Sequence, residues 1–316
     1  MNKIELEFLE FAKNLEGKIA VGFSGGSDSM AVLHLSKKFI KDFEVVYFSH
    51  GDNPLVDDDV IAIDFCKAEC KRLGLELKVV ELNLEKGKVG WEAAGHKARK
   101  FFAMKNYDNF LLGHHLDDVC ENYFIQFFRG SGSAKILKSE KIMKRPLLKF
   151  SKEEIKCYLR KKQIAWIEDN TNNNTDITRN FWRKKVLPII EEHYPQYKHR
   201  MATAIAVEES NLSLLKELAL LDGLEDFVKT DEIKISSELN KNRIKNLLYF
   251  YCKDKSINIQ RATIEEYVKQ ILRPQKKIEA LFLDKKSLIV KNNNSIEIKI
   301  DLLNNDLNVT KKMKIK

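Results

Sequence analysis

Short apolar runs alternate with longer segments of helical periodicity over residues 18–130, and this alternation constrains the fold more than any other feature of the sequence. The apolar runs read KIAVGF, FEVVYFSH, LELKVVEL and NFLLGH, and each is followed by a helical pattern. Strands that alternate with helices form a parallel sheet that carries helices on both faces. We therefore expect an α/β fold with a doubly wound, mainly parallel sheet.

The loops after the strands are the places where function is expected, because such sheets bind ligands beyond the carboxyl ends of their strands. Three of these loops are rich in polar and small residues. They read SGGSDS after the first strand, HGDN after the second and HHLDD after the fourth, at residues 24–29, 50–53 and 114–118.

A second, smaller domain is expected after the sheet. The polar stretch TNNNTDIT reads as a loop that leads into the helix RNFWRKKVLPII, which Pro188 should kink or end. We place the domain boundary near Tyr194 to Arg200, which gives domains 1–197 and 198–316.

The second domain is expected to be mixed α/β, with helices first and short strands after them. SNLSLLKELALLDGLEDF and NRIKNLLYFYCKD have helical patterns. KKIEALFLDKKSLIVKNNNSIEIKI reads as a strand meander with an Asn-rich turn.

Charge and hydropathy restrict the kinds of partner that the chain is expected to have. The net charge of +9 and the pI near 9.1 favour polyanions, although a lysine-rich composition produces the same balance without nucleic acid. Apolar stretches stay well short of the roughly 18 residues that a membrane span needs, and MNKIELEFLEF does not read as a secretory signal. We expect a cytoplasmic protein without a membrane partner.

The five cysteines include no CxxC pair, and an odd number favours reduced thiols over a disulfide framework. Cys66 and Cys70 share a helix face and could donate two metal ligands. Because no other Cys/His pair is near in the sequence, small core residues are the favoured interpretation.

The SGGSDS loop has the features of an anion site. Gly25 and Gly26 can adopt dihedral angles closed to other residues, so that successive backbone amides converge on an anion at the start of the next helix. A tight turn without a ligand is the alternative. The loop is neither a Walker A motif, which needs Gly-Lys-Ser/Thr, nor a GxGxxG fingerprint. Asp28 suggests a magnesium ligand, because magnesium takes one or two carboxylates together with phosphate oxygens.

The HHLDD loop opens an acidic cluster. Helical spacing predicts that His114, Asp118 and Glu121 lie on one face, with Asp117 beside them. The alternative is an acidic helix start that complements the helix dipole. It explains Asp117 and Asp118, but not Glu121, which lies further along the helix. We favour a pocket for magnesium or for a cationic substrate. Arg129 should end this helix.

A basic pair follows in RNFWR. Arg179 and Arg183 are one helical turn apart and could clamp a phosphate. A solvated basic face is the alternative.

SGGSDS resembles the PP-loop of the N-type ATP pyrophosphatases, which split ATP between the α and β phosphates and adenylate an oxygen of the substrate. Four motifs occur in an order that resembles the tRNA(Ile)-lysidine synthetase family. They are SGGSDS, then GHHxDDxxE with RGSG, then RPLL, and last WxEDxxN followed by RNxxR. That family uses ATP and magnesium to join free lysine to carbon 2 of the wobble cytidine of isoleucine tRNA with a CAU anticodon, and it releases AMP and pyrophosphate. The resemblance covers roughly residues 1–190.

The resemblance implies roles for individual residues. Those implied to be catalytic are Asp28, His114, Asp118, Glu121 and Arg179, with Asp28 also the magnesium ligand. Those implied to bind ATP are Ser24, Gly25, Gly26, Ser27, Asp28, Ser29 and His50. Those implied to contact lysine or tRNA are Arg99, Asp117, Arg129, Asn180 and Arg183. The C-terminal domain would be a tRNA-binding domain.

The implied mechanism has two steps. The cytidine carbonyl oxygen attacks the α phosphorus while the loop amides and magnesium hold the pyrophosphate. The lysine amine, which must first lose a proton because its pKa is about 10.4, then displaces AMP from carbon 2. Asp118, Glu121 and His114 would form the lysine pocket, and the two arginines would contact AMP or tRNA phosphate.

Two other interpretations stay open. A PP-loop tRNA thiolation enzyme would use catalytic cysteines or a cluster held by CxxC pairs, whereas the cysteines here lie in helical patterns away from the ligand loops. A non-catalytic ATP-binding module would leave the acidic third loop and the basic second domain unexplained. The oligomeric state is open, and a homodimer is compatible with the sequence.

Overall fold

The computed structural model describes residues 1–49, 59–82, 91–129, 142–168, 178–234, 239–257, 259–273, 277–282, 287–292 and 295–300. They belong to two compact units, Met1–Ala206 and Val207–Lys316. The units divide within helix α9 (Tyr197–Leu221). The predicted functional boundary between residues 197 and 198 stays a prediction.

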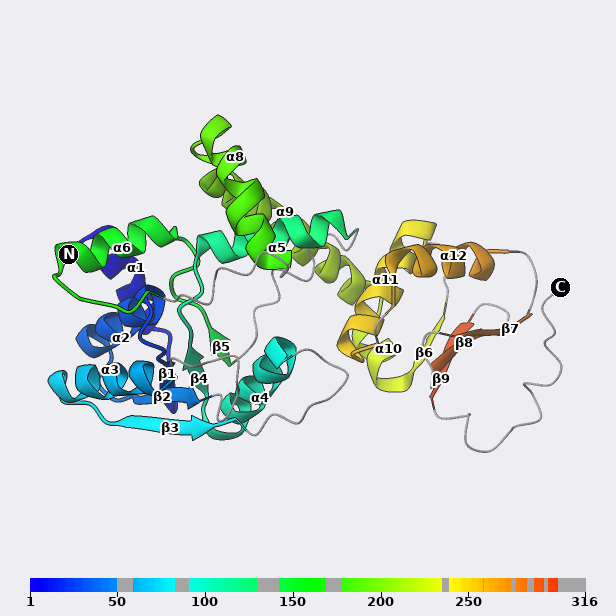
Figure 1. The fold of residues 1–316 in the computed structure, drawn as a ribbon. Helices are drawn as coiled ribbons and strands as arrows, with labels where there is room; N and C mark the ends of the chain where they lie inside the picture. The colour runs from blue at the N-terminus through cyan, green and yellow to red at the C-terminus, as the bar shows by residue number, and fades with distance from the viewer. Residues whose placement is uncertain are drawn as a thin grey trace. The chain divides into compact units, whose positions relative to one another are not determined.

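The first unit is built on a five-stranded sheet in the order β3-β2-β1-β4-β5, with every pairing parallel (Figure 1). The strands are β1 (Ile19–Gly22), β2 (Glu44–Ser49), β3 (Leu77–Glu81), β4 (Asn109–Leu111) and β5 (Met143–Lys144). In the register, Val21 pairs with both Val45 and Leu111. The predicted α/β class with a parallel sheet is confirmed, and the two-residue strand β5 adds to the four strands that the periodicity indicated.

The strand order reverses beside β1. The chain builds outward from β1 through β2 to β3, and then returns to place β4 and β5 on the other side of β1. The loops after β1 and β4 therefore leave the sheet next to each other. In parallel sheets this reversal opens a crevice at the carboxyl ends of the strands, where ligands bind.

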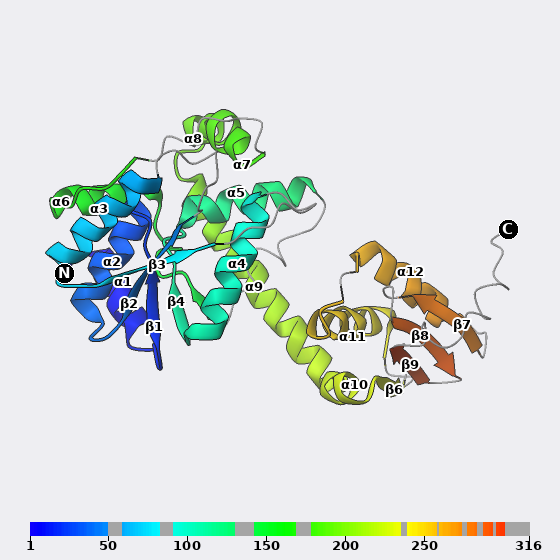
Figure 2. The ribbon, with the colours of Figure 1, turned by 60° about the horizontal axis from the view of Figure 1, so that its bottom comes forward.

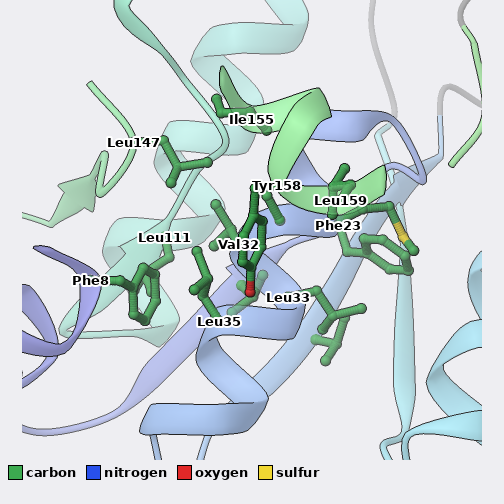
Figure 3. Close-up of a cluster of buried hydrophobic side chains, with 14 of the residues drawn as sticks. Phe8, Phe23, Val32, Leu33, Leu35, Leu111, Leu147, Ile155, Tyr158 and Leu159 are labelled. Carbon is green, nitrogen blue, oxygen red and sulfur yellow. The ribbon is translucent and has the colours of Figure 1, made fainter. Parts of the chain in front are cut away.

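Helices cover both faces of this sheet (Figures 1 and 2). They are α1 (Lys3–Ala12), α2 (Ser27–Phe39), α3 (Asp59–Arg72), α4 (Trp91–Asn106), α5 (Leu116–Phe128) and α6 (Lys152–Lys161). Alternate strand residues point to opposite faces, so Val21 packs with α1, α2, α3 and α6, while Ala20 packs with α4. Figure 3 shows the first of these cores, in which Phe8, Leu33 and Tyr158 come from three different helices.

The segment after residue 177 continues as α7 (Thr178–Phe181), a π-helical turn η3 (Trp182–Val186) and α8 (Leu187–His193). Pro188 lies in the first turn of α8. Because proline has no N–H to donate to the carbonyl four residues earlier, the α-helical hydrogen-bond pattern is interrupted before it. The chain stays helical through Pro188 to His193, so the predicted helix end at this residue is wrong, and the predicted kink stays a prediction.

The second unit has helices α10 (Leu224–Thr230), α11 (Lys241–Asp254) and α12 (Arg261–Ile271), together with an antiparallel sheet of order β6-β9-β8-β7. Its strands are β6 (Glu232–Lys234), β7 (Lys277–Phe282), β8 (Ser287–Asn292) and β9 (Ser295–Ile300). The predicted mixed class and strand meander are confirmed. One predicted helix is wrong in its extent, because Gly223 has a φ of +92° and separates α9 from α10.

None of the helices described here combines the length and the apolar character that crossing a bilayer requires.

A buried carboxylate ties three helices of the first unit together. Glu5 of α1 is 2% exposed and lies 2.8 Å from Lys38 Nζ of α2 and 2.9 Å from Lys162 Nζ at the end of α6. The ammonium group of Lys38 lowers the pKa of Glu5 to about 2, against the opposing effect of burial. The carboxylate therefore stabilises the fold at neutral pH.

We predict that Glu5→Gln lowers the free energy of unfolding at pH 7 by roughly 1–3 kcal/mol, because it removes a buried charge from two ammonium groups. The folded-state pKa lies below the unfolded value of 4.5, so this stabilisation is complete above pH 4.5 and is lost as the pH falls toward 2. Urea unfolding at a series of pH values should show that the free energies of unfolding of the wild type and of Glu5→Gln converge as the pH falls toward 2. Glu10→Gln, which removes an exposed pair with Lys13 on the same helix, should change stability by less than about 0.5 kcal/mol. Equal effects of Glu5→Gln and Glu10→Gln on the free energy of unfolding would contradict the stabilising role of the Glu5 carboxylate.

Candidate active site at the carboxyl edge of the sheet

The loop between β1 and α2 presents backbone amides at the start of a helix. Gly25 has a φ of +81°, and a Cβ atom there would lie 3.1 Å from Ile167 and 3.3 Å from the Cys66 sulfur. Gly26 is the N-cap of α2, and no side chain caps this helix start. The first amides of a helix have no acceptor within the helix, so those from Ser27 onward can bind an anion.

Hydrogen bonds hold the loop in this shape. The Ser24 amide donates to Ser29 Oγ (3.2 Å), and Ser29 Oγ donates to the Gly26 carbonyl (3.0 Å). From the other side, the Ile167 amide donates to the Gly25 carbonyl (3.0 Å). The loop is therefore shaped before any ligand binds.

The segment after β4 lies directly against the start of α2. A Cβ atom on Gly113 would lie 2.7 Å from the Asp28 carbonyl carbon and 2.8 Å from the Ser29 nitrogen. Real Cβ atoms do not approach backbone atoms this closely, so the contact requires glycine. It brings His115, two residues after Gly113, to Asp28.

His115 links the two loops. It is buried, and its Nε2 lies 3.6 Å from Oδ2 of both Asp28 and Asp118, while its Nδ1 lies 3.6 Å from Asp117 Oδ2. Burial alone would lower the pKa of His115, but Asp117, Asp118 and Asp28 together raise it. The sequence reasoning selected His114 and missed His115, although its position directly before the acidic pair was the available signal.

The position predicted for His114 on the helix face is wrong. Helix α5 begins at Leu116, and its N-cap His115 is extended (φ −131°, ψ 179°), so His114 precedes the helix. Burial lowers the pKa of His114 to about 4, which leaves the ring neutral at pH 7. Its Nδ1 is buried without a hydrogen-bond partner among the residues that the structure describes. It nevertheless lies close enough to Asp118 for that carboxylate to act on its pKa.

Two carboxylates of α5 and two arginines form a compact network. Arg179 donates from Nη2 to Asp118 Oδ1 (2.6 Å) and from Nε to Glu121 Oε2 (2.7 Å). Arg183 donates from Nε to Glu121 Oε1 (2.6 Å) and from Nη2 to Glu121 Oε2 (3.0 Å). Glu121 is 1% exposed, whereas the arginine side chains are about 30% exposed.

The charge state of this network is set by its neighbours. Burial disfavours the ionised form of Asp118, but the charges of His115 and Arg179 hold its pKa below the ordinary value. The pKa of Arg183 is raised because its interaction with Glu121 outweighs its own burial. Asp118 is therefore ionised and Arg183 is charged at neutral pH.

Two lysines complete the site, and the sequence reasoning missed both. Lys198 Nζ lies 2.8 Å from Asp117 Oδ1 and 2.9 Å from Glu191 Oε1, and these carboxylates raise its pKa against burial. The other Asp117 oxygen accepts a hydrogen bond from the Lys152 amide at the start of α6 (2.8 Å). The Lys152 ammonium lies 3.6 Å from Asp28 Oδ2. No local sequence pattern joins these residues, because they come from separate helices.

The remaining predicted residues are more scattered. Asn180 is buried in α7 between the two arginines in the sequence. Arg99 lies on α4 and donates to the Gly95 carbonyl (3.3 Å). Arg129 is the C-cap of α5, as predicted, and lies about 16 Å along the helix from Asp118. His50 lies outside the described residues.

Four of the five cysteines are buried, and Cys157 on α6 is half-buried. Cys66, Cys70 and Cys120 are buried, and burial raises their pKa values to about 12, about 11 and about 12. Cys66 and Cys70 pack in the main core of the first unit. The core interpretation of this pair is confirmed.

A parallel sheet with an anion-binding helix start at the reversal of its strand order defines a nucleotide-binding α/β domain. The chain belongs to the PP-loop domain family, which matches residues 1–190 and binds ATP. The predicted membership of the PP-loop superfamily is thereby confirmed.

Curated relatives match about two thirds of the chain. The tRNA(Ile)-lysidine synthase of Neisseria gonorrhoeae is 34% identical over 226 residues, which cover 67% of this chain and 50% of the relative. That of Yersinia pseudotuberculosis serotype O:1b is 34% identical over 216 residues, 63% of this chain and 47% of the relative. The chain therefore spans about half the length of the curated relatives it matches.

A solved structure agrees in fold. The U34-tRNA thiolase NcsA from Methanococcus maripaludis has a TM-score of 0.52 and 18% identity, with 65% of this chain and 76% of that chain covered. This likeness concerns the fold alone.

We predict that Gly113→Ala destabilises the protein by about 1–3 kcal/mol, because the added methyl group overlaps backbone atoms that cannot rotate away. Gly26→Ala is the matched control. Among the residues that the structure describes, a Cβ atom there would meet only Ser24 Oγ at 3.9 Å, and we expect a change within about 0.5 kcal/mol. Urea unfolding of both variants checks the expectation, and a Gly113→Ala protein as stable as the wild type would contradict it.

Proposed function

We propose that the chain ligates lysine to carbon 2 of the wobble cytidine of isoleucine tRNA with a CAU anticodon, through an adenylated cytidine and with release of AMP and pyrophosphate. The observation that carries this proposal is the single histidine that lies 3.6 Å from both the PP-loop aspartate and the acidic helix start. This histidine places the proposed phosphate site of the PP-loop directly beside the proposed cation site of the acidic helix. The names of the curated relatives support the same activity.

In the first step the chain would bind and orient ATP through the amides at the start of α2. The Lys152 ammonium, 3.6 Å from Asp28, adds positive charge where the pyrophosphate leaves. Asp28 fits a magnesium ligand, because its Oδ1 accepts from Ser27 Oγ while its Oδ2 has only longer contacts of 3.6 Å among the described residues. When bound, magnesium would neutralise charge on the departing phosphates.

In the second step the amine of free lysine would replace AMP on carbon 2. Asp118 and Glu121 are the buried carboxylates that can hold its ammonium group. In the structure both Glu121 oxygens already accept hydrogen bonds from Arg179 and Arg183. We propose that the guanidinium groups turn toward the phosphate of AMP or tRNA, and that the lysine ammonium takes their place.

Residues 198–316 would bind tRNA. We also propose that the chain acts in the cytoplasm, on the substrates named above. The basic balance of the chain favours binding that weakens steeply as salt is added, because released counterions drive contacts with phosphates.

Thiolation by a cysteine nucleophile is less well supported. A reactive cysteine needs a lowered pKa and access to solvent. Burial raises the pKa of the three thiols of Cys66, Cys70 and Cys120, so they are protonated at neutral pH.

The test of the proposed function is pyrophosphate release from ATP in magnesium buffer, with unmodified isoleucine tRNA and with lysine present or omitted. We expect release that depends on the CAU-anticodon tRNA, and retention of radiolabelled lysine on the RNA. Release without lysine retention would redirect the function to another tRNA modification. No release under any condition would favour an ATP-binding module.

We predict that Glu121→Ala raises the apparent KM for lysine at least about tenfold, because it removes a charged hydrogen-bond acceptor from the ammonium site. The KM for ATP should change by less than about threefold, since Glu121 does not contact the PP-loop in the described contacts. Incorporation of radiolabelled lysine measures both constants, with lysine varied at saturating ATP in one series and ATP varied at saturating lysine in the other.

Glu153→Gln is the control for this variant, because Glu153 forms an exposed pair with Arg160 on α6. It should leave both constants at the wild-type values. A Glu121→Ala protein with unchanged lysine dependence would exclude Glu121 from the lysine site.

A further inference from the structure

We propose that an exposed aromatic surface beside the acidic cluster is a stacking platform for unpaired bases of the RNA substrate. This inference rests on the proposed function, and it concerns residues that the sequence motifs do not assign. The aromatic surface consists of six rings from α5, α7 and η3: Tyr123, Phe124, Phe127, Phe128, Phe181 and Trp182.

The six rings form one connected set. Trp182 stacks on Phe124 with a centroid distance of 5.5 Å and an interplanar angle of 6°, and it lies 5.1 Å from the ring of Phe128. Phe127 stacks on Tyr123 at 6.3 Å and 12°, and meets the edge of Phe128 at 5.6 Å. Rings held in this way lose little conformational freedom when a ligand binds.

The outer rings are not needed for the core. Phe124 and Trp182 pack against a small core cluster that contains Leu116 and Leu187. In contrast, Phe127, Phe128 and Phe181 are 61%, 68% and 46% exposed. Contiguous exposed aromatic side chains mark binding surfaces rather than packing.

The charge around the rings favours RNA as the occupant. Arg129, Lys184 and Lys185 are exposed beside the aromatic residues in the sequence. The segments 122–129 and 178–190 contain no Asp or Glu. Aromatic faces bordered by cations are the arrangement that binds single-stranded nucleic acid, because the bases stack while the cations contact phosphates.

A second copy of the chain is a poorer occupant. A symmetric dimer through this surface would place the same cations of both copies around one interface, where like charges repel. An RNA strand supplies the complementary charge.

Helix α5 carries four of the six rings as well as the carboxylates of Asp118 and Glu121. Glu121 and Phe128 of α5 are about 10 Å apart along its axis. A rigid helix thus fixes the distance between the carboxylates and the rings. A base that stacks on the rings therefore belongs to a nucleotide close to the one that reacts.

The experiment compares two double variants of the full chain. Phe127→Leu with Phe128→Leu keeps the apolar character and removes the rings, while Phe127→Tyr with Phe128→Tyr keeps the rings. The probe is a fluorescently labelled hairpin RNA with a CAU anticodon loop, and its affinity is measured by anisotropy at several salt concentrations. Leu6→Ala, an exposed apolar change on α1, is the control.

We expect the leucine variant to bind the hairpin about tenfold or more weakly, with an unchanged salt dependence because no cation is lost. The tyrosine variant and Leu6→Ala should bind as the wild type does. Lys184→Ala with Lys185→Ala should weaken binding and reduce the slope against log salt by about 1–2.

Wild-type affinity in the leucine variant would overturn the inference, as would a leucine variant that changes self-association but not RNA binding. Lysine incorporation by the wild type is measured in parallel. Weaker hairpin binding in the leucine variant together with no lysine incorporation by the wild type would support the stacking platform and refute the proposed function.

Discussion

The close contact between the start of α2 and the segment after β4 is the constraint on which the site depends. It exists because the strand order reverses beside β1 and because Gly113 has no side chain. From this contact follow the position of His115 between Asp28 and Asp118, and the position of α5 with its carboxylates. A parallel sheet supplies the edge, but one missing methyl group lets the two loops meet.

Much of the fold was predictable, because its cause is local. Short apolar runs and the helical periodicity between them indicated a parallel sheet, which the chain has. The glycine pair after the first strand indicated an anion site, which stays a prediction. Arg129 also lies at the end of its helix as expected, whereas the helix that was expected to kink or end at Pro188 continues to His193. The break at Gly223 was missed, because a single glycine within a leucine-rich pattern is compatible with a continuous helix.

The site was predictable in its motifs but not in its pairing. Sequence spacing brought Asp118 and Glu121 together on one helix face, because both lie on α5. It could not reveal that Arg179 and Arg183 reach the same carboxylates, or that Lys198 anchors Asp117, since these contacts join segments about 60 to 80 positions apart. His114 and His115 were indistinguishable by type, and only the extended N-cap conformation separates their roles.

The arginine pair also determines what this edge of the sheet presents to solution when no nucleotide is bound. Both guanidinium groups directly contact Glu121, and they lie 2.6 Å and 3.5 Å from Asp118 Oδ1, so the negative potential of the carboxylates is compensated within a few ångströms. Cations in solution therefore meet a nearly neutral surface there. The carboxylates would regain their attraction for an ammonium group only after an anion has drawn the arginines away, so the nucleotide would precede the amine.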